Sequence, residues 1–204
     1  MSDIPYELLM KIQHGTMNTR YRGLPMLKNP FDLALYTMLL ERVQPATLIE
    51  IGTNAGGSAL WFADQRSGMR VLSIDLEPPE SVSHSSVRFL RGDARRLGDV
   101  LTPEVMRSLA RPLLVVEDAS HFAATTAAVL DFFDGWLHPG EYIVVEDGIL
   151  TAMRAAEAYD GGPLRAIHEF LARSGGRYEI DGTLCHYYGR NVTWNVDGYL
   201  RRIA

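Results

Sequence analysis

The 204-residue sequence contains one cysteine, no long apolar run and no excess of positive charge. Its single cysteine, Cys185, cannot form an intrachain disulfide, so we expect a reducing, cytoplasmic location. The formal net charge of −5 argues against nucleic acid or an anionic membrane as a partner, because both favour a basic surface. No apolar stretch reaches the roughly 20 residues of a membrane span, and no export signal is recognisable at the N-terminus.

The composition is that of a globular protein. Apolar residues make up 47% of the chain and charged residues 22%, and a chain of this length can bury a sizeable core. The sequence shows no internal repeat, low-complexity tract or linker. We therefore expect residues 1–204 to form a single domain.

Short apolar runs alternate with helical patterns along the chain. The expected strands are rich in β-branched residues and lack strict alternation, which is typical of a buried parallel sheet; they span 46–52, 70–75, 112–118 and 141–147, with a shorter one at 87–91. Apolar residues at three- and four-residue spacing predict helices at 30–43, 57–65, 103–110, 121–137 and 163–173. One or two further strands are expected after residue 177. The pattern predicts an α/β fold with a mostly parallel sheet and helices on both faces.

In such a fold the carboxyl ends of the strands lie along one edge, and ligands bind in the crevice there. The first strand leads into a glycine-rich turn, Glu50-Ile-Gly-Thr-Asn-Ala-Gly-Gly-Ser58. Its spacing differs from the dinucleotide fingerprint Gly-x-Gly-x-x-Gly. Glu50 suits a cationic amino group better than a pyrophosphate. A purely structural tight turn is the alternative.

Two further acids follow the next strands. Asp75 ends the second strand and can accept hydrogen bonds from a ribose diol. Asp93 follows the short strand and can face an adenine amino group, although a helix cap is the alternative for it. In series with the glycine-rich turn, these positions favour S-adenosylmethionine (SAM) over NAD.

Two Val-Val-Glu-Asp runs place carboxylates at the ends of two other strands. Acids gathered at one edge repel one another unless a cation neutralises them, and hard oxygen ligands favour Mg²⁺, Ca²⁺ or Mn²⁺. We predict Asp118, Glu146 and Asp147 as metal ligands and leave out Glu117, whose side chain should point away from that of Asp118. Glu146 and Asp147 can both contribute only if the strand ends between them. Helix caps or ion pairs with arginines are the alternative.

His121 lies three residues after Asp118, at the expected start of a helix. A histidine there can take the proton from a hydroxyl whose acidity a metal has increased. The alternative is a residue that caps or packs at the helix start.

These motifs together resemble the cephalosporin hydroxylase / rhamnosyl O-methyltransferase family. The resemblance is carried by Lys28-Asn-Pro-Phe-Asp32, Ile49–Ser58, Ser73-Ile-Asp75, Arg91-Gly-Asp93, Asp118-Ala-Ser-His121, Tyr142–Asp147 and Asn195–Arg202. It implies a Rossmann-like class I methyltransferase fold, SAM as the methyl donor and a Mg²⁺-dependent site, with His121 as the general base; Mn²⁺ is the alternative that the acidic ligands allow. One departure is Ala119, where relatives carry serine.

The motifs and the resemblance together predict the cofactor contacts Glu50, Gly52, Thr53, Asn54, Gly56, Ser58, Asp75, Asp93 and Asp118. Residues 1–45 are expected to form a helical N-terminal arm, in which Tyr21 and Lys28 are candidates for lid contacts. The acceptor implied is a sugar hydroxyl of a glycosylated natural product, with a catechol or another vicinal diol as the alternative. A hydroxylase and a non-catalytic SAM-binding partner subunit fit the acid cluster and His121 less well, and the glycine spacing argues against a dehydrogenase. A homodimer is expected to use the apolar N-terminal helices.

Overall fold

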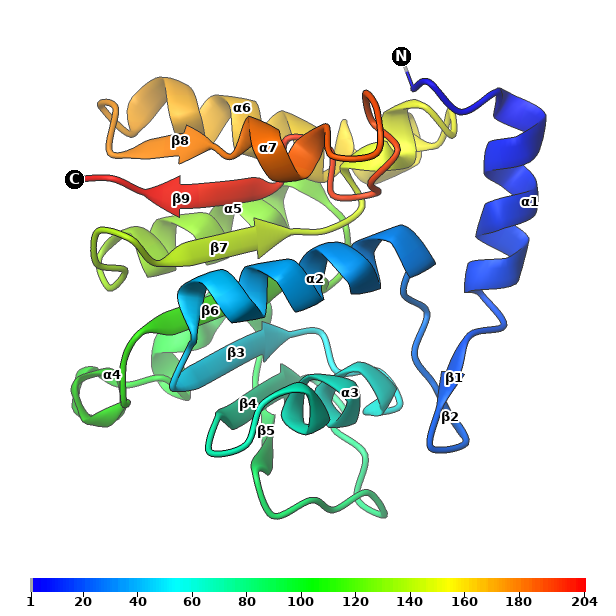
Figure 1. Cartoon of the computed structure of the whole chain (residues 1–204). Coiled ribbons are helices and arrows are strands. Elements are labelled where there is room, and N and C mark those ends of the chain that lie inside the picture. The colour runs from blue at the N-terminus through cyan, green and yellow to red at the C-terminus, as the bar shows by residue number, and fades with distance from the viewer. Residues whose placement is uncertain (1) are drawn as a thin grey trace.

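One seven-stranded sheet forms the centre of the computed structural model, which describes residues 2–204. Its order is β5-β4-β3-β6-β7-β9-β8 (Figure 1). The strands are β3 (Thr47–Ile51), β4 (Arg70–Asp75), β5 (Val87–Arg91), β6 (Leu113–Glu117), β7 (Tyr142–Val145), β8 (Tyr178–Ile180) and β9 (Tyr199–Arg202). The strands β3 to β7 pair in parallel, whereas β9 is antiparallel to β7 and β8.

The central strands are apolar because helices cover both of their faces. Every residue of β3, β6 and β7 is buried. Ile49 packs with one core cluster and its neighbour Leu48 with the other, as side-chain alternation requires. This arrangement confirms the predicted Rossmann-like α/β fold.

Two layers of helices enclose the sheet. One face is covered by α2 (Pro30–Val43), α3 (Gly57–Gln65) and the short α7 (Gly182–Cys185). The other is covered by η1 (Ala94–Asp99), α4 (Pro103–Ser108), α5 (Ala123–Asp134) and α6 (Gly162–Arg173). Figure 1 shows α2 and α3 in front of the sheet and α5 behind it. Two further short helices, η2 (Gly148–Thr151) and η3 (Ala156–Tyr159), connect β7 to α6.

The start of α2 is defined by its local sequence. The side chain of Asn29 caps the helix by accepting a hydrogen bond from the Phe31 N–H at 3.0 Å. Pro30 follows at a helix start, where its missing N–H costs nothing. The capped start fixes the backbone of Lys28, the residue before Asn29.

The N-terminal arm is only partly helical. Helix α1 (Tyr6–Thr16) is followed by a two-stranded hairpin of β1 (Arg20–Tyr21) and β2 (Leu24–Pro25). Figure 1 shows α1 at the side of the sheet toward which β3 and β7 point. Helix α2 packs on the sheet itself. The expectation of a helical arm over 1–45 is therefore wrong for the hairpin, whose two-residue strands carry no periodicity.

Two smaller features complete the fold. Leu9 of α1 is buried against Ile149 and Trp194, which attaches the helix to the loops beyond β7 and before β9. Cys185 lies buried at the end of α7. Among residues 2–204, no helix has both the length and the apolar character needed to cross a membrane.

Candidate active site

A cavity of about 960 Å³ lies at the carboxyl ends of the parallel strands. The loops after β3, β4, β5, β6 and β7 line it, and the arm contributes Gln13, Thr16 and Met17. The predicted crevice is therefore present. Of the predicted site residues, the cavity lining contains Gly52, Thr53, Asn54, Ser58, Asp75, Asp93, Asp118, His121, Glu146 and Asp147.

The glycine-rich turn is built from backbone conformations that favour glycine. Gly52 has φ +99° and Gly56 has φ +87°, both in the left-handed region. A Cβ atom on Gly52 would lie 2.0 Å from the carbonyl oxygen of Asp118, so only glycine allows the turns after β3 and β6 to meet. This contact joins the glycine-rich turn to the acidic segment.

The acids Glu50 and Asp75 hold the turn in place. Glu50 is fully buried, accepts a hydrogen bond from Ser73 at 2.5 Å and does not line the cavity. Burial raises the pKa of the Glu50 carboxyl above its usual range. Asp75 lines the cavity, and its Oδ2 accepts hydrogen bonds from the N–H groups of Thr53 and Asn54 at 2.8 and 3.0 Å. Both acids therefore stabilise the local fold, in addition to any contact with a ligand.

Two other predicted cofactor residues also have local structural roles. Asp93 lines the cavity and caps η1 by accepting a hydrogen bond from the Arg95 N–H at 2.9 Å. This bond, with the nearby guanidinium groups, lowers the pKa of Asp93. Gly56 is the N-cap of α3 and lies outside the cavity lining.

Asp118, His121 and Asp147 converge on the cavity. One ligand atom from each lies within 4.8 Å of the others, which is a geometry that can hold a metal ion. Their side chains are 24%, 28% and 28% exposed, and His121 Nδ1 lies 3.3 Å from Asp147 Oδ2. Burial and the charge of Asp118 raise the pKa of Asp147 to about 6. Protonation competes with a cation at such a site.

The backbone turns in the loops that follow β6 and β7, at His121 and at Asp147. His121 has φ +61° and Asp147 has φ +59°, in the left-handed region that non-glycine residues rarely adopt. Strand β7 ends at Val145. The strand therefore ends before Glu146 rather than between Glu146 and Asp147, and the chain turns at Asp147.

Glu146 lies apart from the group of three. It is 7% exposed, and its Oε1 accepts hydrogen bonds from Tyr36 OH at 2.6 Å and from Lys28 Nζ at 2.7 Å. Lys28 Nζ also donates to Asp118 Oδ2 at 2.6 Å. Burial raises the pKa of Glu146 well above its usual range, although Lys28 acts in the opposite direction. The predicted ligands Asp118 and Glu146 are thus joined through Lys28.

The sequence did not reveal this network. Lys28 was expected as a lid contact but is buried, and Tyr36 showed only as an apolar position of a helix. The one available signal was Lys28 beside the helix start Asn29-Pro30, which fixes its position.

Glu117 points away from the acid cluster. Its Oε2 accepts a hydrogen bond from Thr126 of α5 at 3.1 Å, and it does not line the cavity. Burial raises the pKa of Glu117 to about 7. This position of the Glu117 side chain agrees with the omission of Glu117 from the predicted ligands.

Apolar and aromatic side chains surround the mouth of the cavity. Tyr159 packs edge-on to His121 and Phe122, with ring centroids 5.8 and 5.5 Å apart. Phe122 and Met17 both line the cavity and remain 46% and 53% exposed. The cavity therefore combines a polar floor with an apolar rim.

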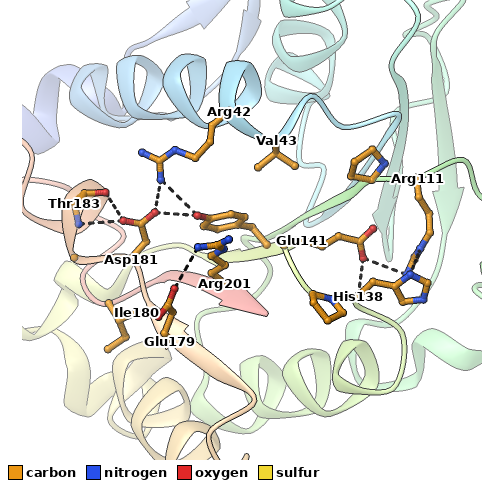
Figure 2. Close-up of a pocket in the computed structure, with 15 residues that line it drawn as sticks. Arg42, Val43, Arg111, His138, Glu141, Glu179, Ile180, Asp181, Thr183 and Arg201 are labelled. Atoms are coloured by element: carbon orange, nitrogen blue, oxygen red, sulfur yellow. Dashed lines mark hydrogen bonds and ion pairs between the residues drawn. The ribbon is translucent and has the colours of Figure 1, made fainter. Parts of the chain in front are cut away.

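A second hollow, of about 830 Å³, lies at the opposite edge of the sheet. Figure 2 shows that charged residues lining it pair with one another. Arg42 contacts Asp181 at 2.5 Å, Arg111 contacts Glu141 at 3.2 Å, and Arg201 contacts Glu179 at 3.6 Å. The acids of this hollow are therefore paired with arginines, whereas Asp118 and Asp147 converge with His121 in the first cavity.

Comparisons with known proteins agree with this geometry. The family model described as Rhamnosyl O-methyltransferase/CmcI matches residues 13–203. A rhamnosyl O-methyltransferase of Mycobacterium leprae is 27% identical over 202 residues, which cover 90% of this chain and 83% of that protein. One from Mycobacterium bovis is 26% identical over 209 residues, which cover 92% of this chain and 82% of that protein.

Solved structures show the same likeness. The structure described as cmcI-D160 Mg-SAM aligns with a TM-score of 0.69 and 27% identity, over 92% of this chain and 78% of its own. The apo structure of CalS11, a TDP-rhamnose 3'-O-methyltransferase, aligns with a TM-score of 0.56 and 18% identity. That alignment covers 98% of this chain and 87% of CalS11, and it supports the fold.

Proposed function

This chain belongs to the rhamnosyl O-methyltransferase/CmcI family, and on that premise we propose that it transfers a methyl group from SAM to a hydroxyl oxygen of a small molecule, with help from a divalent metal. The observation that carries the proposal is the convergence of Asp118, His121 and Asp147 in the same cavity as the glycine-rich turn.

The turn after β3 fits SAM. Its backbone approaches the neighbouring loop so closely that a Cβ on Gly52 has no room, and glycine at such a turn lets a ligand approach the backbone. The proposed contacts that line the cavity are Gly52, Thr53, Asn54, Ser58, Asp75, Asp93 and Asp118. Glu50 and Gly56 support them from outside the cavity lining. Bound SAM supplies the methyl group.

The acids fit a hard divalent cation such as Mg²⁺ or Mn²⁺. We keep Asp118, Glu146 and Asp147 as the ligand set, because all three line the cavity and carboxylate oxygens suit these metals. Lys28 and Tyr36 both bind Oε1 of Glu146, and a carboxylate has a second oxygen. A bound metal would lower the pKa of a coordinated hydroxyl.

His121 is the proposed base. Its Nδ1 faces Asp147, so its other ring nitrogen, Nε2, is the atom that accepts the proton from the acceptor hydroxyl. Asp147 orients the ring and stabilises the protonated form. The protein's remaining contribution is the alignment of the hydroxyl oxygen with the methyl group.

The acceptor is proposed to carry a sugar. The relatives named above are rhamnosyl O-methyltransferases. Within residues 2–204, four buried polar atoms of cavity-lining residues lack a hydrogen-bond partner: Gln13 Oε1, Thr16 Oγ1, Asn29 Nδ2 and Trp194 Nε1. Such atoms are costly to leave unpaired, and sugar hydroxyls both donate and accept. A catechol offers fewer such groups and is the second candidate.

The test is release of S-adenosylhomocysteine with methyl rhamnoside or catechol as the acceptor. We expect turnover of the rhamnoside in Mg²⁺ and none in EDTA. His121→Gln should lower kcat by about 100- to 10,000-fold and leave the calorimetric Kd for SAM unchanged. His168→Gln is the matched control, because His168 pairs with Asp197 at 2.9 Å outside the cavity. Turnover that survives EDTA would contradict the role of the metal. An unchanged kcat in the His121→Gln variant would show that His121 is not the base.

A single domain over 1–204, a cytoplasmic location and a homodimer stay predictions. Exposed apolar residues of α1, namely Tyr6, Leu8 and Met10, are available for the homodimer contact. Light scattering of the purified protein tests it, and a monomer mass would exclude it.

A further inference from the structure

Lys28 contacts two of the clustered acids, Asp118 and Glu146, from the buried interior of the protein. Its side chain is 2% exposed, and its Nζ lies 2.6 Å from Asp118 Oδ2 and 2.7 Å from Glu146 Oε1. Both acids line the cavity, whereas Lys28 does not. The ammonium group therefore bridges the two carboxylates from the core side.

The start of α2 holds this ammonium group in place. Lys28 precedes the capped helix start at Asn29 and Pro30. From the same helix, Tyr36 donates to the same oxygen of Glu146 at 2.6 Å. Groups that hydrogen-bond to metal ligands from outside the site fix the orientation of those ligands.

The charge of Lys28 is matched by its partners. Its Nζ lies at ion-pair distance from both carboxylates, 2.6 Å from Asp118 and 2.7 Å from Glu146, which favours the ammonium form. A buried charge whose partner is removed is strongly destabilising.

We propose that Lys28 is a positioning residue and the resident counter-ion of the metal site. It keeps Asp118 and Glu146 together when no metal is bound, and its positive charge weakens the binding of the divalent ion. The three carboxylates and Lys28 together leave two negative charges, which one divalent cation neutralises. This inference rests on the proposed function, because it concerns the same metal.

The first measurement is the calorimetric Kd for Mg²⁺ of EDTA-treated and desalted protein, without SAM. Lys28→Met removes the charge and keeps an unbranched side chain, and Lys28→Gln removes the charge and keeps a donor. Both should bind Mg²⁺ about tenfold more tightly or better, because one repelling charge is gone. Lys28→Arg keeps the charge and should stay within about threefold of the wild type.

Tyr36→Phe is the matched control. It removes the other hydrogen bond to Glu146 Oε1 without changing the charge. Its Kd for Mg²⁺ should stay within about threefold of the wild-type value, since a neutral hydrogen bond contributes modestly.

The second measurement is the Tm in EDTA and in saturating Mg²⁺. Lys28→Met should lose about 10 °C in EDTA, because the buried carboxylate of Glu146 and the partly buried carboxylate of Asp118 lose their cation. Most of that loss should disappear in Mg²⁺, which replaces the missing charge. A purely structural lysine would lower the Tm equally in both conditions.

The outcomes separate the two proposals. If the wild type does not bind Mg²⁺, the proposed function fails. If the wild type binds it and Lys28→Met and Lys28→Gln bind it equally or more weakly, the inference about Lys28 is wrong and the proposed function stands. Equal Tm losses in EDTA and in Mg²⁺ would also overturn the inference. Should Lys28→Met fail to fold, Lys28→Gln supplies both readouts, because its amide still donates to a carboxylate.

Discussion

Asp32 is a buried carboxyl group in the first turn of α2, 3% exposed. Its two oxygens accept hydrogen bonds from the Thr193 hydroxyl and from the Trp194 N–H, the latter at 3.1 Å. Burial raises the pKa of Asp32 to about 7 despite these bonds. The residue ties α2 to the loop before β9, which lines the cavity through Trp194.

The protonation of Asp32 should make stability depend on pH. Because its pKa is about 7 in the folded protein and about 3.9 in an unfolded chain, the folded state binds more protons between these values. The free energy of unfolding should therefore fall as the pH rises from about 4 to about 7, by up to about 4 kcal/mol from this group. Asp32→Asn cannot ionise and should remove that part of the slope. Urea unfolding at pH 5 and pH 8 measures it.

The control for this prediction is Asp99→Asn, an exposed acid at the end of η1. It should keep the wild-type difference between pH 5 and pH 8. Glu117 and Asp147 titrate in the same direction and are retained in both variants. An Asp32→Asn variant with an undiminished difference would show that Asp32 is ionised throughout.

At the scale of elements, the hairpin β1–β2 rests directly on the start of α3. A Cβ on Gly57 would lie 2.2 Å from the carbonyl oxygen of Pro25. Gly57 is the first residue of α3 and lies at the end of the glycine-rich turn. Its lack of a side chain therefore lets the arm close over that turn.

We expect Gly57→Ala to displace the hairpin and leave the sheet intact. The added methyl group overpacks the contact, at a cost of about 1–3 kcal/mol. Hydrogen exchange should quicken at the Met26 amide, which donates to Thr19 at 3.0 Å. The Kd for SAM should rise, because the arm lines the cavity.

The matched control is Gly15→Ala in α1, where a Cβ meets no atom within 4 Å. That change should strengthen the helix by up to about 1 kcal/mol and leave exchange at Met26 unaltered. An unchanged exchange rate at Met26 in Gly57→Ala would mean that the hairpin accommodates the methyl group without losing stability.

The strands were predictable because their signal is local. Ile49 and Val115 lie in apolar runs whose burial on both faces follows from composition alone, and each run ends in an acid or glycine. The sequence indicated that Glu146 and Asp147 could both bind a metal only if the strand ended there. It could not show whether the chain turns at Asp147. Strand alternation likewise separated Glu117 from Asp118.

The pairing of Lys28 could not be read in the same way. Its partners Asp118 and Glu146 lie 90 and 118 residues away, so its burial depends on tertiary contacts. Glu50 was expected to contact the cofactor because it lies near the end of a strand, and in the structure its buried side chain accepts a hydrogen bond from Ser73 of the neighbouring strand β4. The hairpin is too short for a periodic pattern. In each case the sequence does not reveal which distant residue contacts the segment in the folded protein.

At the scale of the whole molecule, the proposed cofactor region and the proposed metal region share Asp118. Its backbone carbonyl meets the turn at Gly52, and its carboxylate belongs to the acid cluster. A ligand that orders this segment on one side prepares it for a ligand on the other. Two sites joined in this way should bind with positive coupling.

We therefore predict that Mg²⁺ lowers the calorimetric Kd for SAM by about fivefold or more, and that SAM lowers the Kd for Mg²⁺ by the same factor. Reciprocity is required by thermodynamics, so measuring both directions checks the result internally. Asp147→Ala removes a proposed metal ligand that follows β7 and lies outside the glycine-rich turn; it should abolish the coupling while SAM alone still binds as in the wild type. Independent binding of the two ligands would contradict the prediction. It would mean that the segment at Asp118 is already rigid without either ligand, held by Lys28 and by the turn at Gly52.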